Sequence, residues 1–284
     1  SQEATHSLNM IRAVLTDKVT SPLSEVILPS VFESIFIVLE KNDNWDLVTA
    51  ANLCLAAVIR KIKKKNVSQE DDNDTKSSKP LANDFDNNEA LKKLKKTKNR
   101  KMKKNQQSLL LNQFFNKMPN SKESIINGLK SKSSHLNYLS LLTLSSFSSN
   151  STSSETDKEL QSLVIKHLVS SRDSRMRRLA SRSAVAVTNE NDLLALFKET
   201  IESLSHQSFN ALHGQVMLLR EILQHLELHN QDLNDFVAAG KLFPTFNWRK
   251  IPPFIFDDLF FVCHVIGRSE LIPTESVEFN EFYY

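Results

Sequence analysis

The sequence predicts an all-α fold, an α-solenoid in which helix pairs stack as in HEAT or armadillo repeats, with a disordered charged linker. The first observation is the scarcity of turn residues, because the 284 residues include only 4 glycines and 8 prolines. The second is a repeating pattern after residue 156, where predicted amphipathic helices of roughly 15 residues alternate with short polar connectors.

Residues 1–66 form the first predicted segment and are expected to hold three helices. Apolar residues recur at helical spacing, beginning at Leu8. Pro22 suits the first turn of a second helix, and Asp43 or Asn44 suits the cap of a third. This segment is therefore predicted to be a helical repeat region.

Residues 67–107 form a charged segment that is predicted to be a disordered linker. Residues 60–104 hold 16 Lys and Arg against 7 Asp and Glu, whereas the rest of the chain holds 20 against 26. Few hydrophobic residues are present to offset the entropy of ordering the chain. The basic residues that end the segment are Lys92, Lys93, Lys95, Lys96, Lys98, Arg100, Lys101, Lys103 and Lys104. They are open to three interpretations: contact with RNA phosphates, a nuclear-import signal, or a solvated loop.

Residues 108–284 form the second helical segment. Helices are expected at about residues 108–118, 121–130, 134–147, 156–169, 174–188, 190–205, 208–228, 231–240 and 256–266. The Ser- and Thr-rich residues 145–154 are expected to form a loop. Pro244, Pro252 and Pro253 predict irregular structure before the last helix.

Several classes of function are disfavoured by the composition. A Walker loop, a dinucleotide-binding fingerprint and a Gly-x-Ser-x-Gly nucleophile are absent, and glycine is scarce throughout. Cys54 and Cys263 have no metal or redox spacing, which favours reduced, buried thiols in a cytosolic or nuclear protein. No apolar run approaches the roughly 20 residues of a membrane span. We therefore expect a non-catalytic cytoplasmic protein, and we expect the chain to be part of a longer one.

Four arginines form the best candidate binding surface. Arg175, Arg178 and Arg182 follow one another at helical spacing, and Arg172 precedes them. A ridge of guanidinium groups is suited to bind phosphates or the carboxylates of a partner. The alternative is a ladder of salt bridges between stacked repeats.

Two histidine features carry a weaker signal. His213 precedes Gly214 in a predicted helix, where glycine costs about 1 kcal/mol relative to alanine. We expect a neighbouring helix to pack closely over Gly214, and we expect His213 to be a hydrogen-bonded structural residue rather than a ligand or base. His225 and His229 have the spacing of a metal pair, but no third ligand is evident, so no metal site is predicted.

Five stretches in order resemble helices of the THADA family, whose shared region is a domain of unknown function called DUF2428. They are Asn9–Asp17, Trp45–Ile62, Phe114–Pro119, Arg178–Ala184 and Leu212–Gly214. The chain departs from the family at Val48-Thr49, where an Arg-Asn pair is usual. It also lacks the family's Arg-Arg-Ser-Ala-Gly-Leu-Pro stretch, and the similarity fades after His225.

The resemblance implies a large armadillo-type protein whose fungal member is the non-catalytic subunit of a tRNA 2′-O-methyltransferase. That complex methylates the first nucleotide of the anticodon loop. The catalytic partner would bind S-adenosylmethionine, and this chain would bind no cofactor itself. The expected assembly is a hetero-oligomer with the methyltransferase and tRNA, without a membrane. A protein–protein adaptor that does not contact RNA is the alternative, because many solenoids bind only proteins.

Overall fold

The computed structural model describes residues 2–16, 21–40, 44–71, 111–118, 120–147, 157–204, 208–229, 231–245 and 251–272. Every regular element within these ranges is a helix, which confirms the all-α prediction. Contacts divide the chain into two compact units, Ser1–Ile125 and Ile126–Tyr284. The predicted linker lies outside the described residues, except that α3 (Trp45–Asp71) runs to Asp71. The division into segments at residues 66 and 107 stays a prediction.

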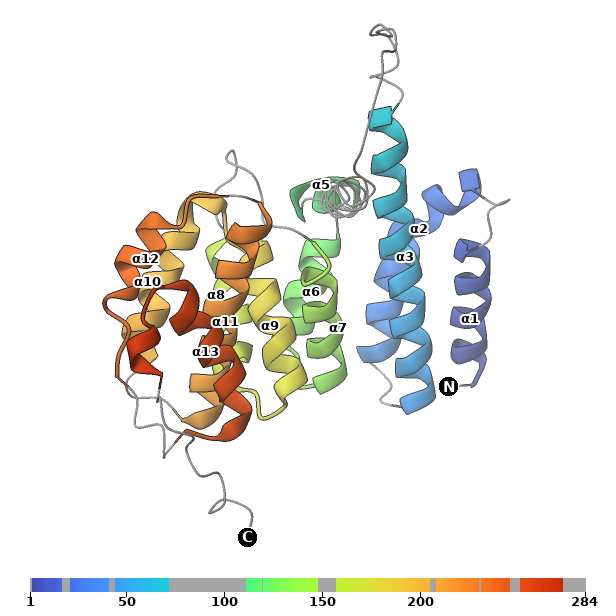
Figure 1. Ribbon diagram of the computed structural model, residues 1–284. Coiled ribbons are helices and arrows are strands. Elements are labelled where there is room, and N and C mark those ends of the chain that lie inside the picture. Colours follow the sequence, from blue (N-terminus) through green and yellow to red (C-terminus); the bar gives the residue numbers. More distant parts are fainter. Residues whose placement is uncertain are drawn as a thin grey trace, which may run out of the picture. The chain divides into compact units, whose positions relative to one another are not determined.

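The first unit is built on α3. The helices α1 (Gln2–Thr16) and α2 (Ser21–Glu40) both pack against it, as Figure 1 shows. The first turn of α3 is capped by Asn44, whose Oδ1 accepts a hydrogen bond from the amide of Asp46 at 2.9 Å. The buried ring of Phe32 meets that of Phe114, on α5 (Leu111–Lys117), edge-on with centroids 5.6 Å apart.

The division between the units falls within α6 (Ser121–Lys130). The remaining elements are α7 (Ser134–Leu144), α8 (Lys158–Ser170), α9 (Ser174–Val187), η1 (Glu190–Asp192), α10 (Leu193–Ser203), α11 (Phe209–Leu228), α12 (Asn234–Gly240), η4 (Pro253–Ile255), α13 (Phe256–Val265) and η5 (Ser269–Leu271). Their bounds lie within a few residues of the predicted ones. None of the described helices is long and apolar enough to cross a membrane.

The second unit is a stack of helix pairs. The helices α7, α9, α11 and α13 pack one against the next, whereas α8 and α10 pair with α9 and α11 (Figure 1). The helices α9 and α11 run in the same direction. Arg177 bonds to Asn210 near the start of each helix, and Arg182 bonds to Glu221 further along both. Parallel neighbours joined by antiparallel returns are the architecture of an α-solenoid, which confirms the predicted fold class.

The helix α8 packs very closely against α11 at Gly214. A Cβ atom added at Gly214 would stand 2.2 Å from the backbone oxygen of Leu168, on α8. Glycine is therefore required there because the α8 backbone occupies the space of a side chain. The prediction that a neighbouring helix packs over Gly214 is confirmed.

Candidate functional site

The predicted arginine ridge lies on and just before α9. Asp173 is the N-cap of α9, and its Oδ1 accepts a hydrogen bond from the backbone amide of Arg175 at 2.8 Å. Alanines on the opposite face are buried, so the arginines are held outward. The side chains of Arg172, Arg175, Arg178 and Arg182 are all exposed. The ridge is therefore a surface feature of a well-packed helix.

One member of the ridge forms the salt bridge that the alternative interpretation expects. Nε of Arg182 lies 3.1 Å from Oε1 of Glu221, on α11, and the two side chains are 51% and 21% exposed. A pair this exposed contributes little to stability. Among the described residues, Arg172, Arg175 and Arg178 have no ion-pair partner. Three of the four guanidinium groups are thus available to bind an anionic partner.

The basic residues between Lys92 and Lys104 lie outside the described residues. Their assignment to a tRNA- or partner-binding surface stays a prediction, as does that of the ridge.

Arg177 is one of the four arginines of α9 itself, and it turns inward. It is only 3% exposed, and its Nη1 donates to the backbone oxygens of Ser171 and Arg172 at 2.9 and 3.0 Å. These carbonyls follow the last turn of α8, where a cation is favoured by the helix dipole. Burial lowers the pKa of Arg177, although the charge of Asp173 raises it. Sequence reasoning missed this residue because its spacing within the arginine-rich helix does not distinguish it.

Arg177 also begins a buried polar chain that joins three helices of the second unit. Its Nη2 lies 3.0 Å from Nδ1 of His213, on α11. Nε2 of His213 lies 3.5 Å from Oδ2 of Asp258, on α13, and Nη1 of Arg220 donates to Oδ1 of Asp258. The polar chain therefore runs Arg177–His213–Asp258–Arg220.

The proton of His213 can be placed from its neighbours. Arginine has no hydrogen-bond acceptor, so Arg177 must donate to Nδ1, and the ring proton must lie on Nε2, facing Asp258. Burial raises the pKa of Asp258, but hydrogen bonds from His213 and Arg220 and the charge of Arg220 hold it below its ordinary value. Asp258 is thus an ionised carboxylate between two donors.

This arrangement differs from a catalytic histidine–aspartate pair in one respect. A general base keeps one ring nitrogen free for the substrate, with the other oriented by a carboxylate. In His213 both nitrogens are engaged, and the ring is buried at 3% exposure. The geometry therefore fits the predicted hydrogen-bonded structural histidine. Its aspartate partner was not evident from the sequence because Asp258 belongs to a distant helix.

The histidine pair at the end of α11 is in close contact, with the two rings tilted by 43°. The rings of His225 and His229 have centroids 4.4 Å apart, and Nε2 of His225 lies 3.9 Å from Oε1 of Glu190. Burial and the nearby charge of His229 lower the pKa of His225 to about 4. Within the described residues, no group of three or more His, Cys, Asp or Glu side chains is placed to hold a metal ion.

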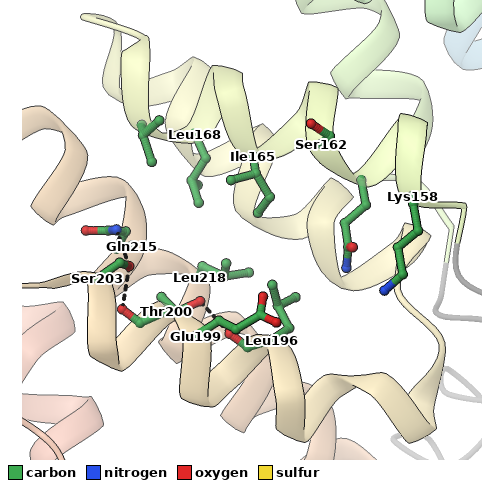
Figure 2. A pocket seen from close by; sticks show the side chains of 12 residues that line it. Lys158, Ser162, Ile165, Leu168, Leu196, Glu199, Thr200, Ser203, Gln215 and Leu218 are labelled. Atoms are coloured by element: carbon green, nitrogen blue, oxygen red, sulfur yellow. Dashed lines mark hydrogen bonds between the residues drawn. The ribbon is translucent and has the colours of Figure 1, made fainter.

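A groove of about 290 Å³ lies on the other layer, between α8 and α10. Figure 2 shows side chains of α8 facing those of α10, with Lys158 at one end and Gln215 at the other. Gln215 donates to Oγ of Ser203 at 2.6 Å, and that hydroxyl donates to the backbone oxygen of Thr200 at 2.8 Å. The amide orientation is thereby fixed, and Oε1 of Gln215 is left buried without a hydrogen-bond partner among the described residues.

Comparisons with known proteins give one match. No curated protein and no solved structure is similar enough to report. The finer resemblance to the THADA family and its DUF2428 region therefore stays a prediction. TPR repeats, like HEAT and armadillo repeats, are stacked helix pairs. Residues 91–222 of this chain match the family model described as the C-terminal TPR repeats of Trm732.

Proposed function

We propose that this chain is a non-catalytic helical subunit that supports tRNA 2′-O-ribose methylation at the first anticodon-loop nucleotide. The observation that carries the proposal is the match of residues 91–222 to the C-terminal TPR repeats of Trm732. A separate methyltransferase would bind S-adenosylmethionine and carry out the chemistry. This chain would bind no cofactor and would present the tRNA to its partner in a hetero-oligomer.

The exposed arginines of α9 are the surface that we assign to tRNA or to the methyltransferase. Arg172, Arg175 and Arg178 have no ion-pair partner among the described residues, so binding a phosphate would break no existing contact. The basic run of residues 92–104 is the second candidate. The buried His213, with both nitrogens engaged, supports a role without catalysis.

Reconstitution with a candidate methyltransferase tests the proposal. The full chain and the methyltransferase are expected to co-purify, and 2′-O-methylation of a tRNA transcript is expected to require both. Methylation at an undiminished rate without this chain would contradict the proposal. Binding of S-adenosylmethionine to this chain alone would contradict the assignment of the chemistry to the partner.

A protein–protein adaptor without RNA contact is the second candidate, and the groove between α8 and α10 favours it. Its lining combines apolar residues, such as Ile165, Leu196 and Leu218, with polar ones, which suits an amphipathic peptide. The two candidates differ in their salt dependence. Phosphate contacts make affinity fall steeply with salt, whereas binding of an apolar peptide changes little.

A further inference from the structure

Two exposed phenylalanines lie close to the arginine ridge. Phe209 is 54% exposed and Phe254 is 57% exposed, whereas the other described phenylalanines are buried or half-buried. A ring that is more than half exposed leaves apolar surface in water that burial would favour. Exposed apolar rings that lie near one another often mark a binding site.

The two phenylalanines are related through His213, which Phe254 contacts and which lies one helical turn after Phe209. The ring of Phe254 lies on that of His213, with centroids 5.0 Å apart and planes inclined by 57°. Phe209 lies four residues before His213 on α11, so the two side chains leave the same helix face. His213 is itself held by Arg177 and Asp258, which gives this face a rigid base. We call Phe209 and Phe254 the aromatic platform.

The buried guanidinium of Arg177 ties the platform to the ridge. A single atom, Nη1, donates to the backbone oxygen of Arg172 at 3.0 Å and to Oδ1 of Asn210 at 3.2 Å. Asn210 is the neighbour of Phe209. The backbone of the exposed Arg172 therefore lies near Asn210, next to the platform. Arg175 follows on the first turn of α9.

The charges around the platform favour an anionic partner on one side. Arg172 and Arg175 have no ion-pair partner in the described part of the chain, and the nearby Asp173 is occupied as the cap of α9. Asp257, exposed in the first turn of α13 after Phe254, would repel phosphate. A bound backbone would thus follow the arginine side.

We infer that the aromatic platform stacks unpaired bases of a single-stranded RNA loop, while Arg172 and Arg175 bind the adjoining phosphates. Aromatic faces beside guanidinium groups are the chemistry by which proteins bind unstacked nucleotides, and they do so with little sequence preference. Two isolated rings offer too little apolar area for a stable protein interface. The inference rests on the proposed function and deepens it, because an anticodon loop is a single-stranded RNA loop.

Binding of a fluorescein-labelled tRNA transcript to the full chain tests this inference. Phe209→Ala and Phe254→Ala are each expected to raise the Kd about tenfold, as loss of one stacked base does. Leu242→Ala is the matched control, since Leu242 is an equally exposed apolar residue, at 59%, after α12. That control is expected to leave the Kd unchanged.

Two further substitutions separate stacking from folding. Phe254→Leu keeps an apolar contact on His213 without an aromatic face and is expected to weaken binding, whereas Phe254→Trp is expected to retain it. The phenylalanine variants should leave the slope of log Kd against log salt unchanged. Arg172→Gln should reduce that slope by about one, because one phosphate contact is lost.

The outcomes distinguish this inference from the proposed function. Salt-dependent tRNA binding that stays within twofold of wild type in Phe209→Ala and Phe254→Ala would overturn the inference alone. Absence of tRNA binding by the wild-type chain, with or without the methyltransferase, would overturn both. Phenylalanine variants that lose the methyltransferase but still bind tRNA normally would make the platform a protein interface and likewise overturn the inference.

Discussion

At the scale of single residues, the contrast between Arg177 and Arg178 shows how neighbouring arginines differ in their contribution to stability. Arg177→Met would leave the carbonyls of Ser171 and Arg172 and the ring of His213 without a donor. Buried groups that lose a charged partner typically destabilise a protein by about 3–5 kcal/mol. Arg178→Met, at an exposed position, is the matched control and should change stability by no more than about 0.5 kcal/mol. Urea unfolding of both variants measures the difference, and equal stabilities would contradict the assigned role of Arg177.

The contact between His225 and His229 predicts a dependence of stability on pH. The pKa of His225 is about 4 in the folded chain and is about 6.5 when the chain is unfolded. The unfolded state therefore takes up a proton first, and stability is lost as pH falls from about 6.5 towards 4. The full difference is on the order of 3 kcal/mol. His225→Gln should flatten this part of the profile of unfolding free energy, whereas His264→Gln, at an exposed site on α13, should not. A wild-type profile without a decline over this range would refute the prediction.

Both cysteines should be unreactive while the protein is folded. Burial raises the pKa of Cys54 and of Cys263 to about 11, and both side chains are fully buried. The thiolate is the reactive species, so a thiol reagent at pH 8 should label neither residue before the chain opens. Ser162→Cys provides an exposed thiol on α8 as a control for rapid labelling. Rapid native labelling of Cys54 or Cys263, measured by mass spectrometry, would contradict the buried assignment.

At the scale of helices, two glycines predict different responses to a methyl group. A Cβ at Gly214 would meet the backbone oxygen of Leu168, whereas one at Gly240 would meet the side chain of Ile266 at 2.7 Å. Gly214→Ala should destabilise the second unit by about 3 kcal/mol or more despite its better helix propensity. Leu168→Ala should not relieve this cost, because a backbone atom is in the way. Ile266→Ala should relieve part of the cost of Gly240→Ala. Thermal unfolding of the four single and two double variants measures these couplings, and rescue of Gly214→Ala by Leu168→Ala would disprove the packing argument.

The helices were more predictable from the sequence than the site. The bounds of α6, α9 and α11 follow from apolar periodicity and from caps such as Asp173 and Ser208, which act within a few residues. The partnership of Arg177, His213 and Asp258 depends on three helices that meet only after folding. Periodicity places side chains on faces, but it does not say which helix covers a face. The ridge was therefore found from its spacing, and the buried network beneath it was not.

At the scale of the whole molecule, the solenoid separates two kinds of surface within the second unit. The α9 side carries unpaired guanidinium groups and the aromatic platform. The groove between α8 and α10 lies on the other layer, and its lining mixes apolar side chains with polar ones such as Lys158 and Glu199. If the proposals hold, a stack of helix pairs carries the proposed RNA-binding surface and the proposed peptide-binding groove on separate layers. Each surface can be altered separately by substitution of exposed residues.

Reversing the charge of the arginine ridge tests whether the position of the arginines or the net charge of the chain governs tRNA affinity. Arg175→Glu, Arg178→Glu and Arg182→Glu together should weaken binding of a tRNA transcript at least tenfold and flatten its salt dependence, while circular dichroism stays unchanged. A control triple variant, Lys132→Glu, Lys166→Glu and Lys198→Glu, makes the same change of net charge at exposed positions. If the ridge is the contact surface, the control should retain most of the affinity, because only long-range attraction is reduced. Equal losses in the two variants would mean that tRNA responds to net charge alone. Unchanged affinity in the arginine variant would remove the ridge from the binding surface and leave residues 92–104 as the remaining candidate.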